Sequence, residues 1–307
     1  YLDDNSISDI SSLSGLTQLE QLGLWKNQIA DLTGLENCTN LTELYLDDNR
    51  VSDISSLSGL TQLEKLGLGR NQIADVSDLA GLSALSELYL SRNQITNISS
   101  LSGLTQLQKL SFGGNQITDV SALTNLTSLS ELYLWGNPIT NISPLSGLTQ
   151  LQKLNLWSNQ VDSAAALSGL VELRQLSLSY NRISDISLLT GLTKLEGLWL
   201  YQMPLNLDAY NTHIPQLEGQ GTTVSYDSIT DNFADRMTIS SSGGGFFSNN
   251  TNATSEADEP NPFSKDTANI HSLWWRWVAP NDGVVQVTTE GSDFDTVLAV
   301  YTGADLA

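Results

Sequence analysis

Apolar and polar positions alternate along most of the chain in a pattern that repeats every 22 residues. An asparagine marks each repeat without a slip, and the nine members are Asn5, Asn27, Asn49, Asn71, Asn93, Asn115, Asn137, Asn159 and Asn181. Around them the residues follow LxxLxLxxNxIxDIxxL, as in residues 19–35. The L-x-L portion has the period of a β-strand, with leucines on one side. One repeat cannot bury its own leucines, so the pattern predicts stacked repeats that share a continuous core.

This pattern resembles the leucine-rich repeat, in the 22-residue form of bacterial internalins, over about residues 1–226. The resemblance implies an α/β solenoid in which parallel strands line the concave face and short 3-10 helices or turns form the convex side. The recurring asparagine stands where the chain turns off each strand, and its amide can bond the backbone of neighbouring turns. We therefore interpret the asparagines as structural.

A second column of short polar residues follows the asparagines on the convex side. Its members are Asp9, Asp31, Asp53, Asp75, Asp119 and Asp185, with Asn97 and Asn141 at equivalent positions. A carboxylate column could hold metal ions, but asparagine replaces aspartate freely and no second ligand column accompanies it. We interpret these residues as turn formers or caps.

A longer period of 44 residues lies above the first, because alternate repeats resemble one another most. One outward strand position reads Gln21, Glu43, Lys65, Glu87, Lys109, Glu131, Lys153 and Gln175. Neighbouring strands lie about 4.8 Å apart, so charges of opposite sign alternate and each interior glutamate has a lysine on either side. We interpret this Glu/Lys ladder as part of the scaffold.

Aromatic residues are frequent at the outward strand positions of the concave face, the usual ligand surface of the resembled fold. They are Trp25, Tyr45, Tyr89, Tyr133, Trp135, Trp157, Tyr180, Trp199 and Tyr201. Tryptophan and tyrosine dominate binding hot spots, so we predict a ligand-binding surface, densest in the C-terminal half. Small neighbours are expected to leave the rings accessible; they are Gly113, Gly114, Gly136, Ser158 and Ser179. The alternative is β-propensity alone, and it carries equal weight for the three tyrosines that recur with the 44-residue unit.

The repeat ends at Met203, where the next asparagine would fall, and residues 206–226 are predicted to cap the open core. Residues 227–307 carry strand-like runs between turn residues, which indicates an antiparallel β-sandwich. The segments WWRW, APNDG and FDTVLAVY in this region resemble the pre-peptidase C-terminal type of bacterial β-sandwich. The chain begins within a repeat and ends just after a predicted strand. We therefore expect a piece of a longer protein, which holds only the N-terminal part of an all-β sandwich.

Some relatives of that sandwich hold calcium through carboxylates and carbonyls. The candidates for such a site here are Glu256, Asp258, Glu259 and Asn261, or Asp293 and Asp295. Acidic surface loops are ordinary in a chain of this charge, so no cofactor is the first expectation and calcium is the alternative.

Charge and motifs exclude several classes of function. With 13 Lys+Arg against 34 Asp+Glu, the net charge of −21 argues against nucleic acid and against anionic lipid as partners. No apolar stretch is long enough to span a bilayer. The single cysteine, Cys38, excludes a disulfide framework, and His213 and His271 stand too far apart in sequence to indicate a catalytic pair. No hydrolase, metalloprotease or phosphate-binding motif occurs.

The sequence therefore predicts a non-enzymatic recognition or adhesion protein that binds a protein or a glycan through the aromatic concave face. We expect it to be monomeric and located outside a bacterial cell or at its surface, with a signal peptide beyond this piece. The alternative is a targeting segment of a larger secreted hydrolase or protease whose catalytic domain lies elsewhere.

Overall fold

The computed structural model describes residues 1–206, 208–227, 237–239 and 275–277. The chain divides into two compact units, Tyr1–Tyr226 and Asp227–Ala307, and each is described by itself. Within the described residues no helix has both the length and the apolar character needed to cross a bilayer.

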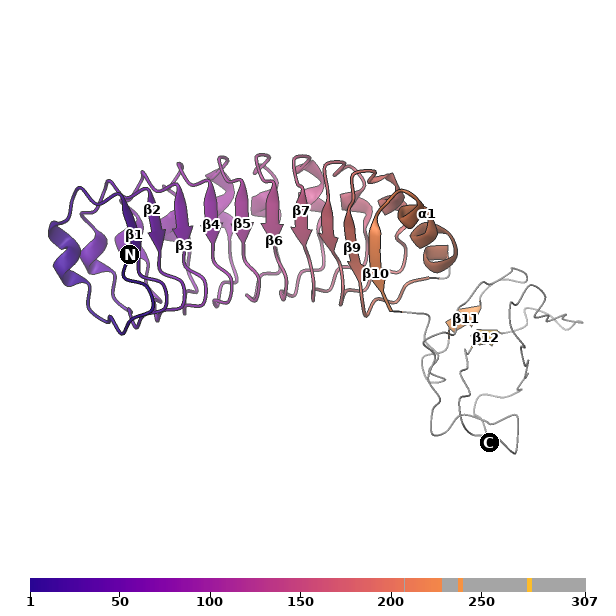
Figure 1. Cartoon of the computed structure of the whole chain (residues 1–307), viewed down its shortest axis with the longest axis horizontal. Helices are drawn as coiled ribbons and strands as arrows, with labels where there is room; N and C mark the ends of the chain where they lie inside the picture. The colour runs from indigo at the N-terminus through magenta and orange to yellow at the C-terminus, as the bar shows by residue number, and fades with distance from the viewer. Residues whose placement is uncertain (207, 228–236, 240–274, 278–307) are drawn as a thin grey trace, which may run out of the picture. The chain divides into compact units, whose positions relative to one another are not determined.

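The first unit is a solenoid with one parallel sheet whose ten strands follow each other in chain order (Figure 1). The strands are β1 (Gln21–Gly23), β2 (Glu43–Tyr45), β3 (Lys65–Gly67), β4 (Glu87–Tyr89), β5 (Lys109–Ser111), β6 (Glu131–Tyr133), β7 (Lys153–Asn155), β8 (Gln175–Ser177), β9 (Gly197–Leu200) and β10 (Thr223–Tyr226). From β1 to β9 each residue pairs with the residue 22 positions further on, as Leu22 does with Leu44. The predicted solenoid with parallel strands is confirmed, and we call the outer side of this sheet the concave face.

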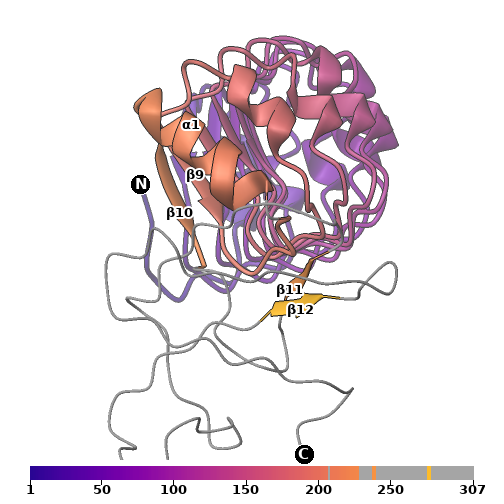
Figure 2. The same ribbon diagram turned by 90° about the vertical axis from the view of Figure 1, so that its right-hand side faces the viewer.

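Short 3-10 helices connect the strands on the other side of the coil (Figure 2). They are Ser11–Gly15, Thr33–Leu35, Ser55–Leu57, Ser77–Leu79, Ser99–Gly103, Ser121–Leu123, Ser143–Gly147, Ala165–Leu167 and Ser187–Gly191. The polar column that precedes them forms turns, since Oδ1 of Asp53 accepts the Ser55 N–H at 2.9 Å. Asn97 accepts the Ser99 N–H at the same distance. This explains why asparagine and aspartate exchange there, and the interpretation as turn formers is confirmed.

The core is one continuous cluster that consists mainly of leucines and isoleucines. Asparagines of the repeat lie beside it, and five of them are buried. Asn137 is 4% exposed. Its Nδ2 donates to the carbonyls of Phe112 and Leu134 at 3.1 and 2.9 Å, and its Oδ1 accepts the Ile117 N–H at 3.0 Å. The amide thus ties its own repeat to the preceding one. Equivalent bonds recur from Asn27 to Asn181, which confirms the structural role.

The cap consists of a π-helical turn, Ala209–His213, the helix α1, Ile214–Gly219, and strand β10. Ala209, Ile214 and Leu217 are buried and cover the last repeat. Nδ1 of His213 is buried and has no hydrogen-bond partner among the described residues.

In the second unit, the described residues form two strands, β11 (Met237–Ile239) and β12 (Trp275–Trp277). β12 lies within a predicted strand-like run, while β11 was not predicted. The two strands pair in parallel, whereas the sequence predicted antiparallel neighbours. The rest of the predicted sandwich lies outside the described residues, as do the calcium candidates Glu256, Asp258, Glu259, Asn261, Asp293 and Asp295. Both stay predictions.

Candidate ligand-binding surface

Each repeat presents three outward positions on the concave face. The first two are the ends of the strand, such as Glu43 and Tyr45, and the third follows two residues later, as in Asp47. The leucines between them point into the core and are fully buried. Because the register is constant through β9, each position forms a straight column across the repeats.

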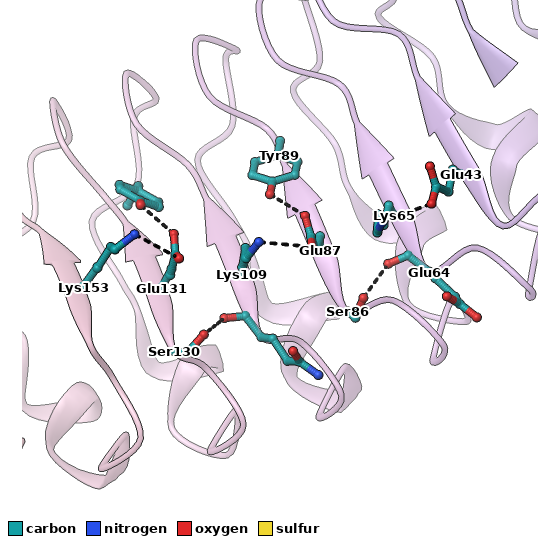
Figure 3. A network of polar contacts seen from close by, with 12 residues as sticks. Glu43, Glu64, Lys65, Ser86, Glu87, Tyr89, Lys109, Ser130, Glu131 and Lys153 are labelled. Atoms are coloured by element: carbon teal, nitrogen blue, oxygen red, sulfur yellow. Dashed lines mark hydrogen bonds and ion pairs between the residues drawn. The ribbon is translucent and has the colours of Figure 1, made fainter. Parts of the chain in front are cut away.

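The first column holds three ion pairs (Figure 3). In each pair the lysine Nζ reaches the glutamate of the preceding repeat: Lys65 to Glu43 at 3.0 Å, Lys109 to Glu87 at 3.2 Å and Lys153 to Glu131 at 3.2 Å. Within the described residues the predicted ladder is therefore made of three separate pairs.

Three of the predicted aromatic residues belong to this network. The hydroxyls of Tyr45, Tyr89 and Tyr133 donate to the glutamate two residues earlier, at 3.3, 2.6 and 2.7 Å. Burial, followed by the bond to Glu131, raises the pKa of Tyr133 to about 12. Burial alone would raise the pKa of Glu131, but the bonds from Tyr133 and Lys153 lower it. The three rings are half-buried, and each is bonded to a glutamate of the ladder.

Five of the nine predicted aromatic residues are well exposed, with 37% to 50% of their surface open to solvent: Trp25, Trp157, Tyr180, Trp199 and Tyr201. Of these five, Trp25 is the one near the N-terminal end, and it lies in the loop after β1. The other four lie in the repeats of β7, β8 and β9. Tyr180 is not at a strand position, because it occupies the turn after β8 with a φ of +59°.

We call the aromatic residues of the C-terminal half the C-terminal patch: Tyr133, Trp135, Trp157, Tyr180, Trp199 and Tyr201. The ring centroids of Trp135 and Trp157 lie 6.4 Å apart, and those of Trp157 and Tyr180 lie 5.6 Å apart, edge to face. An open depression of about 400 Å³ lies between Tyr133, Trp157 and Trp199. Its polar lining is Lys153, Asn155, Gln175 and Ser177. Lys153 is already paired, so this part of the surface is close to neutral.

Trp135 lies flat against two glycines. A Cβ on Gly113 would lie 2.0 Å from its ring, and a Cβ on Gly114 would lie 3.2 Å from it. The glycines were expected to leave the ring accessible, but they let it pack down, and Trp135 is half-buried. The guanidinium of Arg92 lies over the same ring, 5.6 Å from its centroid.

A second depression, of about 630 Å³, lies toward the N-terminal end. Its lining includes Trp25, Tyr45, Asp47, Arg70 and Arg92. Oδ1 of Asp47 accepts the Gly69 N–H at 2.8 Å, and burial raises the pKa of this carboxyl above its ordinary value. The sequence reasoning missed Arg70 and Arg92. The available signal was that both stand just before the repeat asparagine, 22 residues apart.

The described residues hold no group of three or more histidine, cysteine or acidic side chains that could bind a metal ion. Cys38 is fully buried at a position that is leucine in other repeats, and burial raises the pKa of its thiol. A buried, protonated thiol is a poor nucleophile.

Comparison with known proteins agrees with the repeat architecture. The family profile described as leucine-rich repeats, two copies, matches residues 39–81, 83–126, 127–169 and 171–217, together more than half of the chain. No curated protein matches the chain.

Several solved structures share the fold. Internalin C2 of Listeria monocytogenes is 41% identical with a TM-score of 0.52, over 62% of this chain and 75% of that protein. Internalin F of the same organism is 28% identical with a TM-score of 0.53, over 74% of this chain and 81% of that protein. A plant peptide hormone receptor, 24% identical with a TM-score of 0.61, matches 73% of this chain and 39% of its own, and shows only that the fold is shared. The chain belongs to the leucine-rich repeat family, and its solenoid is of the internalin type.

Proposed function

We propose that this chain is a non-enzymatic recognition protein that binds a protein ligand through the C-terminal patch of its concave face. The observation that carries the proposal is the contact chain from Trp135 through Trp157 to Tyr180, beside an open depression that Trp199 also lines. Large rings held in place by each other lose little conformational entropy when a ligand covers them.

The neutral lining of the depression supports the same conclusion. Amide and hydroxyl groups can bond a ligand without the desolvation cost of a bare charge. Internalin-type neighbours support a location outside the cell or at its surface. A recognition surface needs no cofactor, and the proposal includes none.

The test is the double substitution Trp157→Ala with Trp199→Ala, measured against arrays of host and bacterial surface proteins. Both side chains are exposed, so the variant is expected to fold. Loss of two central rings should lower the affinity for the ligand by more than about 30-fold.

Val171→Ala with Leu188→Ala is the matched control, because these side chains are 48% and 50% exposed and neither lies in a strand of the concave face. A protein ligand that binds the double variant as tightly as the natural chain would contradict the proposal. A glycan array is read in parallel, and a ligand found only there would assign the patch to carbohydrate instead.

A further inference from the structure

Of the four basic residues of the solenoid without an ion pair among the described residues, two arginines line a depression of the concave face. Residues 1–226 hold 10 Lys+Arg and 22 Asp+Glu, so acids outnumber bases about two to one. Six of the ten basic residues form ion pairs within the described residues: Lys26, Lys65, Lys109, Lys153, Arg174 and Lys194. Arg70 and Arg92 form none there, although both are exposed.

These two arginines occupy equivalent positions in adjacent repeats. Each stands in the turn that follows β3 or β4, with φ values of +52° and +59°. Equivalent atoms of adjacent repeats are separated by about 4.8 Å in this sheet geometry. Both side chains line the second depression. Their positive charges therefore act on the same volume.

The guanidinium of Arg92 contacts the ring of Trp135. Its charge lies 5.6 Å from the ring centroid, within the range of a cation–π contact. The contact depends on the glycine pair beneath it, since Cγ of Arg92 lies 3.4 Å from the place of a Cβ on Gly114. A cation–π contact does not use the N–H groups of the guanidinium as hydrogen-bond donors, so they remain available to a ligand.

Two carboxylates, those of Asp3 and Asp47, line the same depression. Each accepts a backbone N–H, from Trp25 and from Gly69, at 2.8 Å. Among the described residues neither carboxylate forms an ion pair with Arg70 or Arg92, so the N–H groups of both guanidiniums remain open to a ligand.

We propose that Arg70 and Arg92, with the ring of Trp135, form a subsite that takes the carboxylate of a glutamate or aspartate side chain of the protein ligand. This inference rests on the proposed function and adds the chemistry of one contact. A guanidinium fork matches a carboxylate in two parallel hydrogen bonds. Because most of the solenoid repels acidic groups, this subsite sets where an acidic residue can dock and so fixes the register of the ligand.

The test uses a phage library of random 16-residue peptides, selected on the full chain at low salt. The selected peptides are sequenced, and the best are synthesised for affinity measurement. We expect enrichment of glutamate or aspartate, and binding that weakens about ten-fold in the variant Arg70→Gln with Arg92→Gln. Replacing the acidic residue of the peptide by its amide should weaken binding to the natural chain similarly, but not to the variant.

Arg50→Gln with Arg182→Gln is the matched control. These arginines are also exposed and without an ion pair among the described residues, but they follow the repeat asparagine and do not line the depression. The control removes the same charge and should leave binding unchanged.

The outcomes separate this subsite from the proposed function. Selected peptides without acidic enrichment, or acidic peptides that bind the Arg70/Arg92 variant undiminished, would overturn the subsite alone. Peptides that bind the Trp157/Trp199 variant undiminished would overturn the C-terminal patch. A heparin hexasaccharide that binds the natural chain but not the Arg70/Arg92 variant would also overturn the carboxylate assignment, in favour of a sulfated glycan.

Discussion

The N-terminal half of the concave face, from β1 to β4, and the C-terminal half, from β6 to β9, have the same backbone and different side chains. In the N-terminal half the third column carries Trp25, Asp47, Gly69 and Ser91, and the Asp47 carboxylate accepts the backbone N–H of Gly69 in the next repeat. At the corresponding positions the C-terminal half carries Trp135, Trp157 and Tyr201. This column therefore holds one ring, one carboxylate and two small residues in the N-terminal half, and three rings in the C-terminal half.

The two halves meet at β5, where Gly113 and Gly114 leave room for side chains from both sides. Trp135 reaches back over the glycines from the C-terminal side, and Arg92 reaches forward from the N-terminal side. The difference teaches that a repeat scaffold separates stability from recognition. Leucines and asparagines are constant, so the outward columns are free to vary without loss of the fold.

Both halves share the same core and the same asparagine column. Asn137→Ala tests whether this column stabilises the repeats, and it has the largest expected effect on the free energy of unfolding. The change leaves the buried Ile117 N–H without its partner. It also removes one of the two asparagine bonds at the carbonyls of Phe112 and Leu134, which keep those from Asn115 and Asn159. We expect a loss of about 3 kcal/mol or more in the free energy of unfolding, measured by urea denaturation. Asn125→Ala, at an exposed asparagine, is the control and should cost little. A small loss at Asn137 would mean that the repeats are not locked together by this column.

The contact between the halves is tested by Gly113→Ala. The new methyl group would lie 2.0 Å from the Trp135 ring, so the ring must leave its place and Arg92 loses its stacking partner. We expect a loss of about 1 kcal/mol and a red shift of tryptophan emission. Gly103→Ala has open space around the new methyl group and serves as the control. An unchanged emission spectrum would show that the position of the Trp135 ring does not depend on Gly113.

Most of the solenoid could be predicted from the sequence because its signals are periodic. A register of 22 residues, a leucine alternation and an invariant asparagine admit one arrangement of strands and core. The structure confirms that arrangement from β1 to β9. The family resemblance supplied the 3-10 helices on the convex side, which periodicity alone does not specify.

The surface was less predictable, because exposure depends on neighbours that sequence spacing does not rank. The sequence placed both Tyr89 and Trp157 at outward positions, with β-propensity as an equally weighted alternative for Tyr89. Yet Tyr89 is half-buried and bonded to Glu87, while Trp157 stands 40% exposed. The packing of Trp135 on glycine, and with it the position of Arg92, could be found only in three dimensions.

The Glu/Lys pairs contribute less than the contacts above, and Glu87→Gln measures one of them. The change removes the charge that Lys109 and the Tyr89 hydroxyl share. Because both groups are partly exposed, we expect a loss of about 0.5–1 kcal/mol in the free energy of unfolding. Glu196→Gln, at the more exposed pair with Arg174, is the control and should cost less. Equal losses would show that the tyrosine bond adds nothing to the ladder.

The smallest effect per site is a dependence on pH that should differ between the halves. Hydrogen bonds from the backbone N–H and hydroxyl of the following serine lower the pKa of Asp9, Asp53, Asp75 and Asp185. A lowered folded-state pKa adds stability above the unfolded value of about 3.9, and that stability is lost as the pH falls through the folded value.

Three of these aspartates lie in the N-terminal half. Two middle repeats carry Asn97 and Asn141 instead, which do not titrate, with Asp119 in the repeat between them. Acid should therefore open the N-terminal repeats first, and amide hydrogen exchange at pH 3 and pH 5 measures the order of opening. Asp53→Asn with Asp75→Asn keeps the turn, as Asn97 does with Ser99, and removes the titration. Acid also reduces the overall negative charge, and it does so in both proteins. The difference in exchange between the variant and the natural chain therefore measures the contribution of Asp53 and Asp75. Equal acid sensitivity in the two proteins would show that the turn column does not distinguish the halves.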